Sequence, residues 1–314
     1  LNFDVAYYHS ETTDQIITVP IDQAVGATSV VVNAGCVRNR GVEVSARFQP
    51  VKTKEFEWTI SANWSKNWNK LVELADGVAM WNLNPNITVG GNIYIRAYPG
   101  TELGRLYGRG YERAPEGAFY VDADGSYVDC SNQIVVDAET GSARLTSTED
   151  ELLDLGSIYP DWTAGMSHSL SYKGFRLGLS FSAQWGGKTY SMTHFALAYQ
   201  GKLKNSLKGR YAGMIVPGVN LNENGTYSKN TTITTDIVDH YTNYVYAREN
   251  AEENVFDTSF LKLKELRLEY SLPRHLCSKT RVFQGITVGV YATNLFCWTN
   301  FPLYDPEAGY AVGS

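Results

Sequence analysis

The sequence lacks any stretch that approaches the roughly 18 consecutive apolar residues of a transmembrane helix. A membrane-spanning helix is therefore excluded. A membrane β-barrel is not excluded by this absence, because each of its strands is short and only every second residue in it is apolar.

Cysteine and clustered basic charge are also scarce. Among 314 residues there are four cysteines, Cys36, Cys130, Cys277 and Cys297, and they lie far apart. They show neither C-x-x-C nor zinc-site spacing, so we interpret them as structural or incidental, and their spacing leaves any disulfide pairing open. The net charge of −6 and the scattered basic residues argue against a nucleic-acid partner.

No pattern of catalytic or metal-binding residues is present. The five histidines fit neither a nucleophile pattern nor a metal pattern, and they are His9, His168, His194, His240 and His275. We therefore predict that the protein is not an enzyme and uses no metal or cofactor. His168 falls on the apolar side of a predicted strand, where we expect it at a membrane interface.

What the sequence does contain is long two-residue alternation. In residues 175–185, Phe, Leu, Leu, Phe, Ala and Trp occupy one side, while Arg, Gly, Ser, Ser and Gln occupy the other. A period of two is the strand period. The run extends for roughly 36 Å at about 3.3 Å per residue, which is the length of strand that crosses a bilayer when tilted.

The same alternation recurs along the chain, in residues 42–48, 56–68, 162–172 and 286–296. The polar sides consist mainly of Ser, Thr, Gly and Asn, which suits a water-filled lumen, whereas a soluble sheet would carry Lys and Glu there. The 21 Tyr and 7 Trp suit membrane interfaces. The predicted fold class is all-β, as part of a large antiparallel transmembrane β-barrel.

Short and long connections alternate between the predicted strands. We expect nine strands, over about 1–10, 41–49, 55–68, 92–98, 103–112, 160–172, 175–185, 257–272 and 285–297. The long connections are 11–35, 69–91, 113–157 and about 70 residues after the seventh strand. Long outer loops and short periplasmic turns are typical of membrane barrels. In the eighth strand the apolar phase changes, which predicts a bulge near Lys264 and Glu265.

Five segments resemble the SusC/RagA family of TonB-dependent outer-membrane transporters, and they occur in the family's order along nearly the whole chain. They are VVNAGCVRNRGVEVSARF (31–48), WTISANWSKNWNKLVEL (58–74), GSIYPDWTAGMSHSLSYKGFRLGLSFSAQWGGKTYSMT (156–193), FDTSFLKLKELRLEYSLP (256–273) and ATNLFCWTNFPLYDPEAGY (292–310).

The resemblance implies a barrel of about 22 strands with a plugged lumen. Residues 1–314 are then expected to be a carboxy-terminal portion of that barrel, without the plug domain, which contacts TonB, and without the last strand. It further implies residence in the outer membrane of a Gram-negative bacterium, mostly Bacteroidota, and import of oligosaccharides or peptides with a SusD-like surface lipoprotein. We expect loops 11–35 and 69–91 to carry that lipoprotein.

Aromatic side chains of the outer loops and two arginines are the candidate substrate-binding residues. Aromatic faces stack on sugars and bury peptide side chains. Arginines that line the lumen would favour anionic substrates. The candidates are Trp81, Tyr190, Tyr199, Tyr241 and Tyr244, together with Arg105 and Arg176. The alternative for each ring is that it packs a long loop into a compact cap.

Two acidic segments resemble ion sites only in part. DADGSYVD, residues 122–129, lacks the third ligand and the glutamate of an EF-hand, so we interpret it as a polar turn. Asp305 and Glu307 are interpreted in the same way, with an ion or partner contact as the alternative.

Two other functions remain open at this stage. A soluble β-sandwich that acts as a binding or adhesion module would need Lys and Glu on the polar faces of its strands. A passive porin-type barrel would need neither a plug nor a partner, and only the family segments argue against it.

Overall fold

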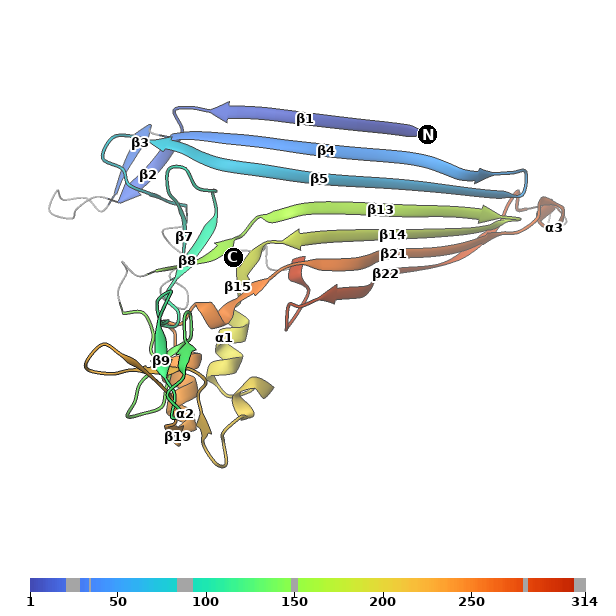
Figure 1. Ribbon diagram of the computed structural model, residues 1–314. Coiled ribbons are helices and arrows are strands. Elements are labelled where there is room, and N and C mark those ends of the chain that lie inside the picture. The colour runs from blue at the N-terminus through green and yellow to red at the C-terminus, as the bar shows by residue number, and fades with distance from the viewer. Residues whose placement is uncertain (21–28, 34, 84–92, 148–151, 279–281, 308–314) are drawn as a thin grey trace.

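The computed structural model describes residues 1–20, 29–33, 35–83, 93–147, 152–278 and 282–307 (Figure 1). Within these ranges, no helix is both long enough and apolar enough to cross a membrane.

A seven-stranded antiparallel sheet dominates the fold, and each strand pairs with the next one in sequence. Its strands are β1 (Asn2–Thr12), β4 (Gly35–Lys52), β5 (Phe56–Leu74), β13 (Pro160–Tyr172), β14 (Phe175–Gly186), β21 (Phe260–Ser271) and β22 (Thr287–Thr299). The predicted all-β, antiparallel fold class is confirmed. Figure 1 shows the sheet as a single layer, with the other strands and most helices gathered at one end.

The pairing register gives the sheet one apolar face and one polar face. Met166 of β13 lies opposite Phe181 of β14, and the neighbouring Ser167 lies opposite Ser180. Residues that pair across neighbouring strands point to the same face of the sheet. The alternation within each strand therefore gives the whole sheet one apolar face and one polar face. Large apolar side chains on the first face are exposed, as Val5 and Val290 show with 56% and 65% exposure.

The prediction of nine strands in one sheet was wrong. Segments 92–98 and 103–112 do form strands, β7 (Ile93–Ala97) and β8 (Arg105–Gly108), but these pair with β6 (Trp81–Asn82) and β12 (Leu153–Ser157) in a separate four-stranded sheet. Five and four residues are too few to cross a bilayer. β5 pairs directly with β13 instead, so residues 75–159 form a single connection.

The predicted alternation of short and long connections is confirmed for the seven strands. At one end lie the turns 53–55 and 173–174 and the connection 272–286, which contains α3 (Arg274–Ser278). Lys173 and Gly174 both have positive φ, 44° and 89°, as a tight hairpin turn requires. The described parts of connections 13–34, 75–159 and 187–259 lie at the other end, which we call the loop end.

The predicted bulge in β21 is confirmed. Phe181 pairs with Leu263 and Ser180 with Glu265, so Lys264 is the extra residue. The register with β22 shifts at the same place. The bulge keeps the apolar residues on both sides of it on one face of the sheet, although their sequence phase changes.

The remaining elements build the loop region. Its strands are β2 (Ile16–Pro20), β3 (Ser29–Asn33), β9 (Phe119–Val121), β10 (Tyr127–Asp129), β11 (Val135–Val136), β15 (Lys188–Tyr190), β16 (Met214–Ile215), β17 (Val219–Leu221), β18 (Tyr227–Lys229), β19 (Ile233–Thr234) and β20 (Val255–Asp257). Its helices are α1 (Met192–Tyr199), α2 (Ile237–Asp239), η3 (Lys204–Leu207), η4 (His240–Val245) and η5 (Glu252–Asn254). The buried apolar clusters lie here and at the adjoining strand ends, for example around Ala198, Ile237 and Tyr241.

Candidate functional site

The polar face of the sheet is lined mainly by small side chains. Ser65 of β5 and Thr163 of β13 share a hydrogen bond of 2.8 Å across this face. Charge increases on β21, where Lys262, Glu265 and Arg267 pair with polar-face partners. This face can therefore border water along its length, and charged side chains are concentrated on β21.

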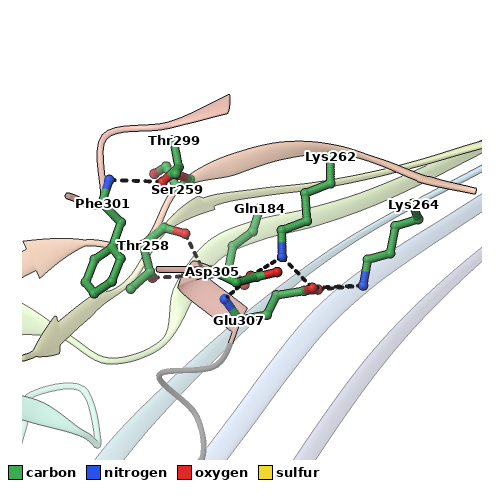
Figure 2. Close-up of polar contacts among 9 residues, drawn as sticks. All are labelled: Gln184, Thr258, Ser259, Lys262, Lys264, Thr299, Phe301, Asp305 and Glu307. Atoms are coloured by element: carbon green, nitrogen blue, oxygen red, sulfur yellow. Dashed lines mark hydrogen bonds and ion pairs between the residues drawn. The ribbon is translucent and has the colours of Figure 1, made fainter. Parts of the chain in front are cut away.

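An ion cluster around the buried Lys262 joins β21 to the residues that follow β22 (Figure 2). Only 1% of the Lys262 side chain is exposed, and its Nζ donates to Asp305 and, at 2.6 Å, to Oε2 of Glu307. Lys264, the bulge residue, reaches both carboxylate oxygens of Glu307 at 2.8 and 2.9 Å. We call residues 300–307 the return segment, because these contacts hold it against the polar face.

Apolar contacts and hydrogen bonds fix the return segment at its other points. Phe301 is buried and packs edge-on against Phe256 and Tyr304, with ring centroids 5.8 and 4.8 Å away. The backbone N–H of Phe301 donates to Oγ1 of Thr299 at 3.1 Å, and that hydroxyl donates to the carbonyl of Ser259 at 2.8 Å. The interpretation of Asp305 and Glu307 as plain turn residues was therefore incomplete, since both also neutralise a buried lysine.

The two carboxylates of the return segment have lowered pKa values. Burial by itself raises the pKa of Asp305 and of Glu307, but the hydrogen bonds and positive charges of Lys262 and Lys264 outweigh it. Both groups are therefore charged when the segment is docked.

Docking of the return segment should weaken in acid. The ordinary pKa values are 3.8 for Asp305 and 4.5 for Glu307, and docking lowers both. The carboxylates therefore stabilise the docked segment fully at a pH above these ordinary values, and this stabilisation is lost as the pH falls below them. Amide exchange of residues 300–307, followed by mass spectrometry, should stay slow from pH 7 to pH 5. After correction for intrinsic exchange, it should accelerate below about pH 4. An unchanged corrected rate would show that the carboxylates do not hold the segment.

The two candidate arginines lie far from one another in the fold. Arg176 is on the polar face of β14, close to the turn 173–174, and its Nη1 lies 3.8 Å from Glu269. Arg105 lies in β8 of the four-stranded sheet, where its Nε donates to Asp154 at 2.7 Å. Thus Arg176 lies on the polar face of the sheet, whereas Arg105 belongs to the loop region, and a role of either in substrate binding stays a prediction.

The candidate aromatic residues are distributed over separate packing clusters. Trp81 packs around Val37, Leu71 and Ala97, and Tyr190 packs around Ile93, Leu106 and Ala251. Tyr241 is buried, and its hydroxyl donates to the carbonyl of Lys208 at 3.1 Å. Tyr244 is half-buried, and Tyr199 on α1 is 48% exposed. The structure does not gather these rings into one site, and their role in substrate binding stays a prediction.

The acidic segment 122–129 forms a β-hairpin turn. Oδ1 of Asp124 accepts hydrogen bonds from the backbone N–H and the hydroxyl of Ser126, at 2.9 and 2.6 Å. A second hairpin uses the same geometry at Asn224 and Thr226. Within the described ranges no group of three or more His, Cys, Asp or Glu residues could hold a metal ion.

Two other expectations concern the loops and the cysteines. The segments expected to carry the lipoprotein, 11–35 and 69–91, lie partly outside the described residues, at 21–28, 34 and 84–91. None of the four cysteines forms a disulfide within the part of the chain that the structure describes.

A polar cluster that the sequence did not reveal ties the long connections together. The Tyr111 hydroxyl donates to Glu253 at 2.8 Å, and Arg113 donates to Glu252 at 2.5 Å. Burial raises the pKa of Glu253, and it also raises that of Tyr111. About 140 residues separate the partners in each contact. No local sequence pattern can therefore predict these contacts.

Comparison of the sequence with known proteins gives TonB-dependent receptors of Formosa agariphila. The chain is 27% identical to TonB-dependent receptor P3 over 317 residues, which covers 99% of the chain and 29% of that receptor. TonB-dependent receptor P26 is 28% identical to the chain over 309 residues, which covers 97% of the chain and 29% of that receptor. No family model matches the sequence. The chain thus spans less than a third of the length of these relatives.

Comparison of the structure gives the RagAB peptide importer. One chain of the importer in its 'closed-closed' state matches this protein with a TM-score of 0.67 and 23% sequence identity. The match covers 98% of this protein and 31% of the importer chain. In the 'open-open' state the TM-score is 0.61 and the sequence identity is 22%, and the match covers 98% of this protein and 30% of the importer chain. At this identity the likeness shows the fold. Together, the two comparisons confirm the predicted resemblance to SusC/RagA-type TonB-dependent transporters.

Proposed function

We propose that this chain is part of the wall and outer loops of a TonB-dependent importer in the bacterial outer membrane. The observation that carries the proposal is the single-layer sheet, whose apolar face is exposed along its length and whose long connections all lie at one end. A soluble β-sandwich would cover that apolar face with a second sheet. An apolar face left to lipid and a polar face left to water fit a membrane barrel.

The whole transporter would have parts that complement this chain. We propose that residues 1–314 are a carboxy-terminal portion of the barrel, that a plug domain contacts TonB, and that a SusD-like lipoprotein covers the loop end. The substrate class that we propose is oligosaccharide or peptide, and the name of the RagAB peptide importer favours the peptide. Substrate held at the loop end would pass the polar face when TonB acts on the plug.

Uptake by intact cells tests this function. Deletion of the full-length gene should abolish growth on, and uptake of, one class of oligopeptide or oligosaccharide, and the same loss should follow from deletion of TonB. Restoring the gene should restore uptake. If uptake persists without TonB while it requires this protein, the passive porin-type barrel replaces the importer. Recovery of the full-length protein as a soluble species would contradict both.

A further inference from the structure

The apolar face of the seven-stranded sheet carries basic side chains at its loop end, on β4 and β5. Within the described strands, the residue pairs that continue this face from β13 to β22 contain no Lys, Arg, Asp or Glu. On β4 and β5 the same face ends in four cations, which we call the basic cluster: Arg38, Arg40, Lys66 and Lys70. On the lipid side of a barrel wall such residues are costly at the bilayer midplane and are tolerated near the interfaces.

Strand pairing places the four cations of the basic cluster beside one another. Arg38 lies directly opposite Lys70, and Arg40 lies opposite Trp68, which is 47% exposed. Lys66 is on the same side of β5 as Trp68, and its Nζ lies 5.1 Å from the centroid of the Trp68 ring. Because directly opposite residues have Cβ atoms roughly 5 Å apart, the cations form one continuous surface around this ring.

The basic cluster lies at the outer end of the apolar band. The positions of β5 that precede Lys66 on this face are all apolar, and they are Phe56, Trp58, Ile60, Ala62 and Trp64. Lys66 is roughly 33 Å along the strand from Phe56, at about 3.3 Å per residue. A strand tilt of about 40° reduces this to roughly 25 Å, which is the height of the apolar band of a membrane barrel. The cluster is therefore at headgroup level.

Most of the positive charge of the basic cluster is not neutralised within the protein. Arg38 forms an ion pair with Glu11, with 3.3 Å between its Nη2 and Oε1 of the glutamate. Glu73 lies further out on β5, opposite Cys36. Three cations have no ion-pair partner among the residues that the structure describes, and they are Arg40, Lys66 and Lys70. Their charge is available to an anionic ligand.

An apolar groove begins beside the basic cluster and runs away from the loop end. The pair of Val44 and Trp64 adjoins the pair of Val42 and Lys66 on the same face. Small side chains beyond it leave a groove of about 530 Å³. Its lining includes four alanines and two aromatic residues, namely Ala46, Ala62, Ala164, Ala183, Trp64 and Phe181. The groove has room for an alkyl chain, and the cations lie at its loop-end border.

We propose that the basic cluster and the groove together bind a lipid of the outer leaflet whose headgroup carries phosphate. The guanidinium of Arg40 can donate two parallel hydrogen bonds to one phosphate, and the ammonium groups of Lys66 and Lys70 add positive charge. One acyl chain of the lipid lies in the groove. A free phosphate would leave the groove unused, and an acidic protein would have to enter the bilayer to reach it.

This inference rests on the proposed function, because only in that arrangement does the apolar face meet lipid and the loop end face outward. Its test is native mass spectrometry of the full-length protein in detergent, titrated with diphosphoryl lipid A. We expect one lipid to bind tightly to each protein. The same lipid after enzymatic removal of its phosphates should bind at least roughly 30-fold more weakly. Inorganic phosphate at the same concentration should not compete, because it has no chain for the groove.

Charge removal decides whether the basic cluster holds the headgroup. The double variant Arg40→Gln, Lys66→Gln should weaken lipid binding roughly 30-fold, since each cation beside an anionic headgroup contributes a factor of about five. Arg47→Gln, Arg267→Gln removes the same charge from the polar face and should leave the affinity unchanged. Ala62→Phe fills part of the groove with an apolar ring. It should weaken binding several-fold and keep the preference for the phosphorylated lipid.

The proposal is overturned if the dephosphorylated lipid binds as tightly, if inorganic phosphate competes as well as the lipid, or if the two double variants lose affinity equally. An unchanged affinity of Ala62→Phe would overturn the assignment of the groove. Heat-modifiable migration on gels verifies that each variant is folded. Failure of the proposed function would look different, because the protein would then be missing from the outer membrane or uptake would not require TonB.

Discussion

Phe181→Arg should prevent most of the full-length protein from assembling in the outer membrane. Phe181 lies on the apolar face opposite Met166 on one side and Leu263 on the other. An arginine on the lipid face near the midplane costs roughly 2–4 kcal/mol in membrane barrels. This cost lowers the folded-to-unfolded ratio by roughly 30- to 700-fold, because each 1.4 kcal/mol is a factor of ten.

Ser180→Arg is the matched control for this prediction, because Ser180 is the adjacent residue and lies on the polar face opposite Glu265. An arginine there remains in water beside a carboxylate, so we expect assembly close to that of the wild type. The measurement is the fraction of heat-modifiable protein in isolated outer membranes. Equal losses for the two variants would show that the apolar face does not contact lipid.

Lys262→Met should release the return segment from the polar face. Methionine keeps much of the side chain's volume but removes the charge that Asp305 and Glu307 share. Removing one partner of a fully buried ion pair costs 3–5 kcal/mol. Here the two carboxylates are 44% and 35% exposed, so solvent lowers the expected cost to roughly 1–3 kcal/mol.

Amide exchange of residues 300–307 measures that release and should accelerate by roughly 5- to 150-fold. Lys264→Met is the control, because Lys264 is 36% exposed and Glu307 is its one ion-pair partner among the described residues, so its effect should be several-fold smaller. The triple variant Lys262→Met, Asp305→Asn, Glu307→Gln removes all three charges and should recover part of the protection. If both single variants leave exchange unchanged, the apolar contacts of Phe301 hold the segment without the ion cluster.

The long strands of the seven-stranded sheet could be predicted from the sequence because their signal is local. Residues 160–172 and 175–185 each alternate over a full membrane thickness, and Lys173-Gly174 joins them by a tight turn, so the sequence predicts both strands and their pairing. Segments 92–98 and 103–112 are also strands, and nothing in their composition shows which sheet they join. That depends on the pairing of β5 with β13, whose partners are about 100 residues apart.

The candidate site was less accessible to sequence reasoning. Lys262 and Asp305 are 43 residues apart, and each looks ordinary in its own neighbourhood. The bulge at Lys264 could be predicted from the change of apolar phase. The sequence does not predict that this bulge helps to place two lysines against one carboxylate. Exposure of aromatic rings is likewise a tertiary property, as the contrast between buried Tyr241 and fully exposed Tyr211 shows.

Cysteine scanning along residues 175–185 would test most directly whether this sheet is the wall of a membrane barrel. The full-length protein would first have Cys36, Cys130, Cys277 and Cys297 replaced, and single cysteines would then be labelled in native outer membranes. We predict a strict period of two. Labels at the apolar positions would be quenched by brominated lipid, and those at the polar positions would react with a water-soluble maleimide. Uniform reaction with the water-soluble reagent, without lipid quenching, would contradict the account.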